Sequence, residues 1–68
     1  MRYAVVIEEA GEGYSAYVPD LPGCIATGRT IDVVEQEIRE AMRFHLEGMA
    51  EDGVPVPRPT SRAEYIEA

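Results

Sequence analysis

The chain has 68 residues and a formal net charge of −7, with 13 acidic residues, six arginines and no lysine. A chain of this length forms one domain at most, and such a domain is marginal alone because it buries only about 60% of its unfolded surface. The acidity argues against direct binding to nucleic acid, which requires a basic surface facing phosphates. It favours a basic protein partner instead.

Covalent and metal stabilisation are excluded by the same composition. Cys24 is the only cysteine and His45 the only histidine, so neither a disulfide nor a closed zinc site can form within one chain, and no cofactor is expected. Self-association is the remaining way to stabilise a small core, and a homodimer is its simplest form. The first apolar run, Tyr3 to Ile7, is too short for a signal peptide or a membrane span, which predicts a cytoplasmic protein without membrane contact.

Three strands are expected before a helix. Arg2 to Glu9 is rich in β-branched residues, and the glycine pair that follows it indicates a hairpin turn. Tyr14 to Val18 is the expected second strand. A loop with two prolines then leads to a short third strand, Cys24 to Thr27, which Gly28 ends.

One long helix is expected from Ile31 to about Glu51. Thr30 is a suitable N-cap, and Gly53 is a natural residue just past the C-terminus. Apolar residues recur at spacings of three and four, which places them on one helical face. These residues are Ile31, Val34, Ile38, Ala41, Met42, Leu46 and Met49.

The last part of the chain is expected to be an extended tail with a short helix, over residues 57–68. Alternating prolines between Val54 and Pro59 exclude both a helix and a central strand. Ser61 and Glu64 have the spacing of a capping box, which predicts a helical turn from Arg62 to Glu67. The predicted fold class is therefore α+β: a three-stranded antiparallel sheet with one long helix on one face and a short C-terminal helical turn.

The first strand is apolar on both faces. Side chains alternate along a strand, so Tyr3, Val5 and Ile7 share one face and Ala4 and Val6 the other. The single helix can cover only one of these faces, and a sheet that is apolar on both faces is normally covered on both. Ala4 and Val6 are therefore expected in core packing or in a homo-oligomer interface.

No catalytic set is evident. Cys24 has only Gly23 and Ile25 beside it, which favours a buried strand residue over a nucleophile. His45 lies within the apolar stripe of the helix, and we interpret it as a packing residue rather than a general base. Glu8 and Glu9 are adjacent on a strand and point to opposite faces, so they cannot share a metal site. We expect no enzymatic activity.

Taken in order, the motifs of the chain resemble the HicB-like antitoxin family. The most specific segment is Gly13-Tyr14-Ser15-Ala16-Tyr17-Val18-Pro19-Asp20-Leu21-Pro22-Gly23-Cys24, followed by Gly28-Arg29-Thr30 at the start of the helix. His45-Leu46-Glu47 and Asp52-Gly53-Val54-Pro55-Val56-Pro57 complete the pattern. The resemblance implies a partial ribonuclease-H-like fold without that fold's catalytic acids. It also implies self-association and an antitoxin that binds and neutralises a small basic toxin, similar to HicA, that cuts messenger RNA.

Two alternatives to the antitoxin role remain open. One is a structural or regulatory interaction domain with a different partner, and the other is a hydrolase or nuclease that uses His45. Many HicB-like proteins carry a second, DNA-binding domain, which we do not expect in residues 1–68.

The second strand and the loop after it are the expected partner-binding surface. Tyrosines are enriched at interfaces, and prolines stiffen a loop so that binding costs little entropy. Asp20 adds a negative charge that could meet a basic partner. The expected contact residues are Tyr14, Tyr17, Asp20, Leu21 and Pro22, with the two tyrosines on opposite faces of the strand.

Overall fold

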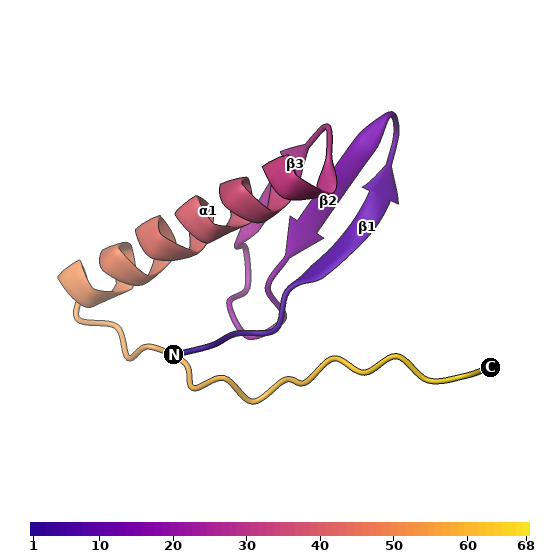
Figure 1. Cartoon of the computed structure of the whole chain (residues 1–68). Coiled ribbons are helices and arrows are strands. Elements are labelled where there is room, and N and C mark those ends of the chain that lie inside the picture. Colours follow the sequence, from indigo (N-terminus) through magenta and orange to yellow (C-terminus); the bar gives the residue numbers. More distant parts are fainter.

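A computed structural model describes the whole chain, residues 1–68, as a three-stranded antiparallel sheet with one long helix across one face (Figure 1). The strands are β1 (Val6–Ala10), β2 (Gly13–Tyr17) and β3 (Ile25–Gly28), in the spatial order β1-β2-β3. The helix α1 (Ile31–Glu51) follows β3 directly. The predicted α+β class and β-β-β-α order are confirmed.

Each strand is shifted or shortened relative to the prediction. β1 begins at Val6 rather than Arg2, because residues 2–5 are extended but form no backbone hydrogen bond to a neighbour. The hairpin turn is made by Gly11 at φ 59°, a conformation that glycine adopts without steric cost. β2 and β3 have nearly the predicted bounds.

The core lies between the sheet and α1. Its buried residues come from β2, the loop between β2 and β3, and α1, whereas β1 and β3 contribute none: Ala16, Val18, Leu21, Cys24, Val34 and Ile38. Gly28 allows the close approach of the helix, since a Cβ at this position would lie 2.7 Å from the backbone nitrogen of Val34. As a result, α1 packs chiefly on β3 and less on β2.

The helix has the bounds expected from its capping residues. The hydroxyl of Thr30 accepts a hydrogen bond of 3.1 Å from the backbone N–H of Val33. At the other end, Gly53 adopts φ 70°, and the N–H of Val54 donates to the carbonyl of Met49. These local bonds satisfy backbone groups that would otherwise end the helix unpaired.

The tail, residues 54–68, is extended throughout, and the predicted helical turn from Arg62 to Glu67 is wrong. Ser61 was expected to cap that helix, but its N–H and hydroxyl both bond to Asp20 in the loop after β2. A single turn is also unstable without packing, and residues 62–68 are all exposed. Figure 1 shows this segment running away from the domain.

The molecule exposes more surface than its mass requires. Its accessible area is 5535 Å², whereas a compact 7.5 kDa protein has about 4,200 Å². Its radius of gyration is 12.9 Å, compared with about 11 Å for a compact chain of this length. The extended tail and the small core both contribute. The structure contains no helix with the length and apolar character needed to cross a membrane.

Candidate partner-binding surface

One row of apolar side chains crosses the sheet on the face opposite the helix. Val6 pairs with Tyr17, and Tyr17 pairs with Ile25, so the three side chains lie side by side across all strands. We call these three residues the bare-face row. Ile25 is 69% exposed and Tyr17 is 41% exposed, while Val6 is half-buried. Exposed apolar residues that are contiguous rather than scattered are typical of an interaction site.

Polar residues flank the bare-face row on the same face. Glu8, Ser15 and Thr27 form the adjacent cross-strand row. An apolar centre beside acidic and hydroxyl groups matches the general arrangement of protein interfaces, which have an apolar core and a polar rim. The surface is therefore suited to a protein partner whose own apolar patch is bordered by basic residues.

The loop after β2 holds the tail through Asp20. Its carboxylate accepts hydrogen bonds from the N–H groups of Thr60 and Ser61, at 3.0 and 2.9 Å, and from both hydroxyls, at 3.0 and 2.8 Å. The bond from the Ser61 N–H is the largest cause that lowers the pKa of Asp20 below its usual value, and partial desolvation opposes it. The Tyr3 hydroxyl also donates to the carbonyl of Pro57.

The structure separates the five residues that the sequence predicted as partner contacts. Tyr17 and Pro22 are exposed, whereas Tyr14 is half-buried against the core on the helix side. The predicted opposite orientation of the two tyrosines is thus confirmed. Leu21 is completely buried, so its assignment as a contact residue is corrected to a core residue. Two backbone hydrogen bonds fold the loop so that Leu21 points inward. The N–H of Leu21 donates to the carbonyl of Val18, and the carbonyl of Leu21 accepts from the N–H of Cys24.

Asp20 was expected to present a negative charge to a partner. Four hydrogen bonds from the tail occupy its carboxylate instead, which makes it an anchor within the chain. Sequence reasoning missed this role because Thr60 and Ser61 lie 40 and 41 residues further along. Conversely, it omitted Ile25, although this is the most exposed member of the bare-face row.

The remaining predicted positions are consistent with packing. Ala4 and Val6 are half-buried on the sheet, and His45 is half-buried on α1 without a side-chain hydrogen bond. Cys24 is a free, buried thiol whose pKa is raised by desolvation. The structure brings together no group of three or more His, Cys, Asp or Glu side chains that could hold a metal ion.

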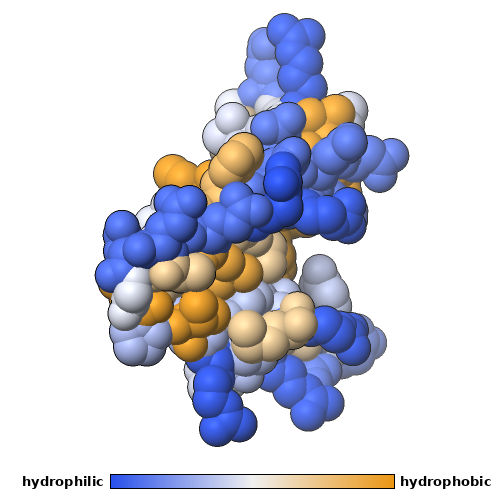
Figure 2. All heavy atoms as spheres, turned by 90° about the vertical axis from the view of Figure 1, so that its left-hand side faces the viewer, coloured by the Kyte–Doolittle hydropathy of each residue, from blue (hydrophilic) through white to orange (hydrophobic).

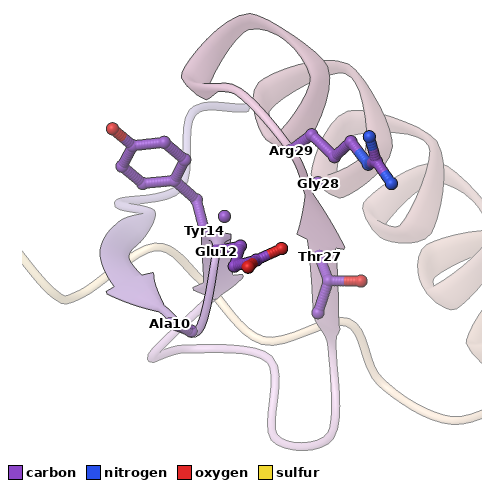
Figure 3. A pocket seen from close by; sticks show the side chains of 7 residues that line it. Ala10, Glu12, Tyr14, Thr27, Gly28 and Arg29 are labelled. Carbon is purple, nitrogen blue, oxygen red and sulfur yellow. The ribbon is translucent and has the colours of Figure 1, made fainter.

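A shallow hollow at the hairpin tip offers no catalytic arrangement. It lies between the β1–β2 turn and the end of β3, and Glu12 and Arg29 are its only charged residues (Figure 3). Figure 3 shows the Glu12 carboxylate pointing towards Thr27, whereas the Tyr14 ring and the Arg29 side chain point away on opposite sides. The hollow therefore lacks the converging groups that a reaction would need.

Comparison with known proteins identifies the relationship of the chain. A family model described as "HicB_like antitoxin of bacterial toxin-antitoxin system" matches residues 3–68. An uncharacterized 14.9 kDa protein of Haemophilus phage HP1 is 39% identical over 66 residues, covering 97% of this chain and 50% of the phage protein. A UPF0150 protein of Thermoplasma acidophilum is 32% identical over 69 residues, covering 100% of both chains.

The fold agrees with a solved structure. A chain of a HicA3 and HicB3 toxin-antitoxin complex matches with a TM-score of 0.76 and 32% identity, over 88% of this chain and 70% of that chain. This chain thus spans half the length of the phage relative and the full length of the Thermoplasma relative. Because the family model and the solved fold both extend over most of its residues, the chain belongs to the HicB-like antitoxin family.

Proposed function

We propose that the chain is a non-catalytic antitoxin module that binds and neutralises a small, basic, HicA-like toxin through the bare face of its sheet. The observation that carries this proposal is the bare-face row, an apolar patch in which Tyr17 and Ile25 remain exposed to solvent. Family membership supplies the class of partner, since the matched solved structure is a toxin-antitoxin complex.

The bare-face row supplies binding energy of the right size. Fully burying an exposed isoleucine contributes about 1.5–3 kcal/mol, and an aromatic side chain adds a comparable amount. Ile25 and Tyr17 are adjacent across two strands, so one partner patch can bury both. A small cluster of this kind usually dominates the affinity of an interface.

The negative charge of the chain favours its association with a basic toxin. The chain carries −7 at neutral pH, and a toxin that holds RNA must present a basic surface to the phosphates. The two proteins therefore attract each other at long range, which raises the association rate at low salt. The acidic chain neutralises the toxin by occupying a basic surface that RNA would otherwise use.

Two other functions have weaker support. An interaction domain with a different basic partner would use the same bare face, and only the identity of the bound protein separates it from an antitoxin. A hydrolase or nuclease that uses His45 is least supported, since no side chain is hydrogen-bonded to this imidazole in the structure.

The test compares two isoleucines that are both exposed. Ile25→Asp places a charge in the bare-face row, and Ile31→Asp makes the same change at the first residue of α1, which is 47% exposed. Each variant is co-expressed with a HicA-type toxin from the source organism, and growth rescue is measured. Affinity for a catalytically inactive form of the toxin is measured by calorimetry. Circular dichroism confirms that both variants are folded.

We expect Ile25→Asp to lose growth rescue and to weaken binding by about a hundredfold or more, which corresponds to about 2.7 kcal/mol. Ile31→Asp should bind like the unchanged chain, because a carboxylate suits the N-terminus of a helix. Equal binding by both variants would move the interface away from the bare face. No binding by the unchanged chain would favour a different partner.

A further inference from the structure

The last seven residues, 62–68, carry two large apolar side chains that the domain leaves uncovered. Tyr65 is fully exposed, and the adjacent Ile66 is 86% exposed. No backbone group of this segment is hydrogen-bonded to another backbone group, and the only hydrogen bond within it joins the side chains of Arg62 and Glu64. Such a segment buries its apolar side chains only when it orders against another surface.

The part of the tail before this segment is fixed to the domain at two points. The Tyr3 hydroxyl donates to the carbonyl of Pro57. Further along, the Asp20 carboxylate accepts four hydrogen bonds, and the last residue that donates to it is Ser61. The anchored and the free parts of the tail therefore meet at Ser61, which determines where residues 62–68 begin.

This anchor lies beside the bare-face row. Asp20 belongs to the loop that joins Tyr17, the last residue of β2, to Ile25, the first residue of β3. Figure 1 shows the tail passing below this loop and leaving on the side away from α1. Seven extended residues reach up to about 25 Å from Ser61, whereas three adjacent strands span only about 10 Å. Residues 62–68 are therefore long enough to extend past the bare face and contact a protein bound there.

The chain itself offers these residues no suitable cover. An apolar groove of about 470 Å³ lies between the first strand and α1. It is on the side that faces the viewer in Figure 2, where apolar atoms reach the surface beneath a hydrophilic ridge, and the tail leaves on the other side. On the bare face, Glu8 would lie near Glu64 and Glu67 and repel them. A basic protein would attract the same two carboxylates.

We propose that residues 62–68 are an arm that orders on the basic protein bound at the bare face and places Tyr65 and Ile66 against its apolar surface. The inference rests on the proposed function, because it assigns a second contact to the same toxin. Asp20 acts as a positioning residue, since it holds the start of the arm beside the bound protein without contacting that protein. Tethering raises the effective concentration of the arm, whereas its ordering costs conformational entropy. The arm therefore adds less affinity than the bare-face row.

Substitutions in the full-length chain test the arm. The arm variant, Tyr65→Ala/Ile66→Ala, removes both apolar side chains. Its matched control, Phe44→Ala/Ile31→Ala, removes an aromatic side chain and an isoleucine that are 63% and 47% exposed on α1. Calorimetry with a catalytically inactive HicA-type toxin measures affinity, and surface plasmon resonance measures the dissociation rate. Heteronuclear NOE values of the arm amides, in the free chain and in the complex, report whether the arm orders on binding.

We expect the arm variant to raise the dissociation constant about tenfold, chiefly through faster dissociation, and the control to stay within about twofold of the unchanged chain. The NOE values of residues 62–68 should be low in the free chain and rise in the complex. Affinity equal to that of the control, tighter binding, or an arm that is already rigid in the free chain would each overturn the arm.

These outcomes are separable from failure of the proposed function. If the unchanged chain binds the toxin and Ile25→Asp abolishes binding while the arm variant has no effect, the bare-face interface stands and the arm is overturned. If the unchanged chain does not bind the toxin, both the proposed function and the arm are overturned.

Asp20→Ala tests the positioning role through a double-mutant cycle. In the unchanged chain we expect this substitution to weaken binding about fivefold, because the arm is no longer held at its start. In the arm variant it should change the dissociation constant by no more than about twofold, since the contacts that Asp20 positions are already absent. An equal loss in both backgrounds would show that Asp20 acts independently of the arm and would overturn its positioning role.

Discussion

The two faces of the sheet are built by the same three strands but differ in how far they are buried. Along β2, Ala16 faces the helix and is buried, while the next residue, Tyr17, faces away and is 41% exposed. On β3, Ala26 packs towards the core, whereas its neighbour Ile25 is 69% exposed. At these positions the helix face carries the small residues Ala16 and Ala26, whereas the bare face carries the larger apolar side chains of Tyr17 and Ile25. Along β2 and β3, a single-residue step therefore separates a side chain that packs on the core from one that is exposed.

The largest effect should follow from a cavity on the helix side. Leu21→Ala removes buried methyl groups from a residue with no exposed surface, and such changes cost about 2–5 kcal/mol. A domain with six buried residues has little reserve, so we expect the variant to be largely unfolded at 37 °C. Urea denaturation of the unchanged chain and the variant measures the difference. A loss below about 1 kcal/mol would contradict the central position of Leu21 in the core.

Two glycine-to-alanine substitutions, at Gly28 and at Gly48, test the close approach of helix and sheet. The added methyl group of Gly28→Ala would lie 2.7 Å from the backbone nitrogen of Val34, so α1 must move away, at a cost of about 1–3 kcal/mol. Gly48→Ala is the matched control, because it lies in α1 with no atom within 4 Å of the new Cβ. That variant should be more stable by about 0.5–1 kcal/mol, since alanine favours the helix. Thermal melting of both variants should give shifts of opposite sign.

A polar substitution on the bare face should leave stability almost unchanged. We expect Ile25→Thr to alter the free energy of unfolding by no more than about 0.5 kcal/mol, because the side chain is mostly exposed and threonine suits a strand. Urea denaturation measures this value beside that of Leu21→Ala. A loss of about 2 kcal/mol or more would show that the bare face supports folding, and the distinction between the faces would fail.

The smallest expected effect concerns the tail anchor at low pH. The pKa of Asp20 is lowered in the folded chain, chiefly by the Ser61 N–H. The anchor's stabilising effect is therefore fully present above the unfolded-state pKa of about 3.9 and is lost as pH falls through the lower folded value. The NMR amide signals of Thr60 and Ser61 should change with a midpoint below 3.9, and Asp20→Asn should abolish that titration. A midpoint at or above the unfolded value would contradict the anchoring.

Features set by neighbouring residues could be predicted from the sequence. Thr30 and Gly53 determine the ends of α1 through hydrogen bonds and backbone conformation within one turn, and both ends were predicted correctly. The hairpin depends on the glycines between two alternating segments, so strand order was also predictable. These signals are local, and tertiary packing does not override them here.

The errors concern contacts between distant residues. A loop flanked by Pro19 and Pro22 is typical of an exposed turn, and only the folded chain shows that Leu21 points into the core. The predicted tail helix fails because Asp20 competes for Ser61, its expected cap, across 41 residues. Tyr17 was predicted from its residue type, whereas Ile25 required the strand register that places it beside Tyr17.

Chemical-shift mapping of the isotopically labelled chain with an inactive HicA-type toxin tests the division between the two faces most directly. The bare-face account predicts that the largest changes occur at Val6, Tyr17 and Ile25, and that the core residues Val34 and Ile38 change little. Changes concentrated on the solvent-facing residues of α1, with the bare-face row unaffected, would contradict it.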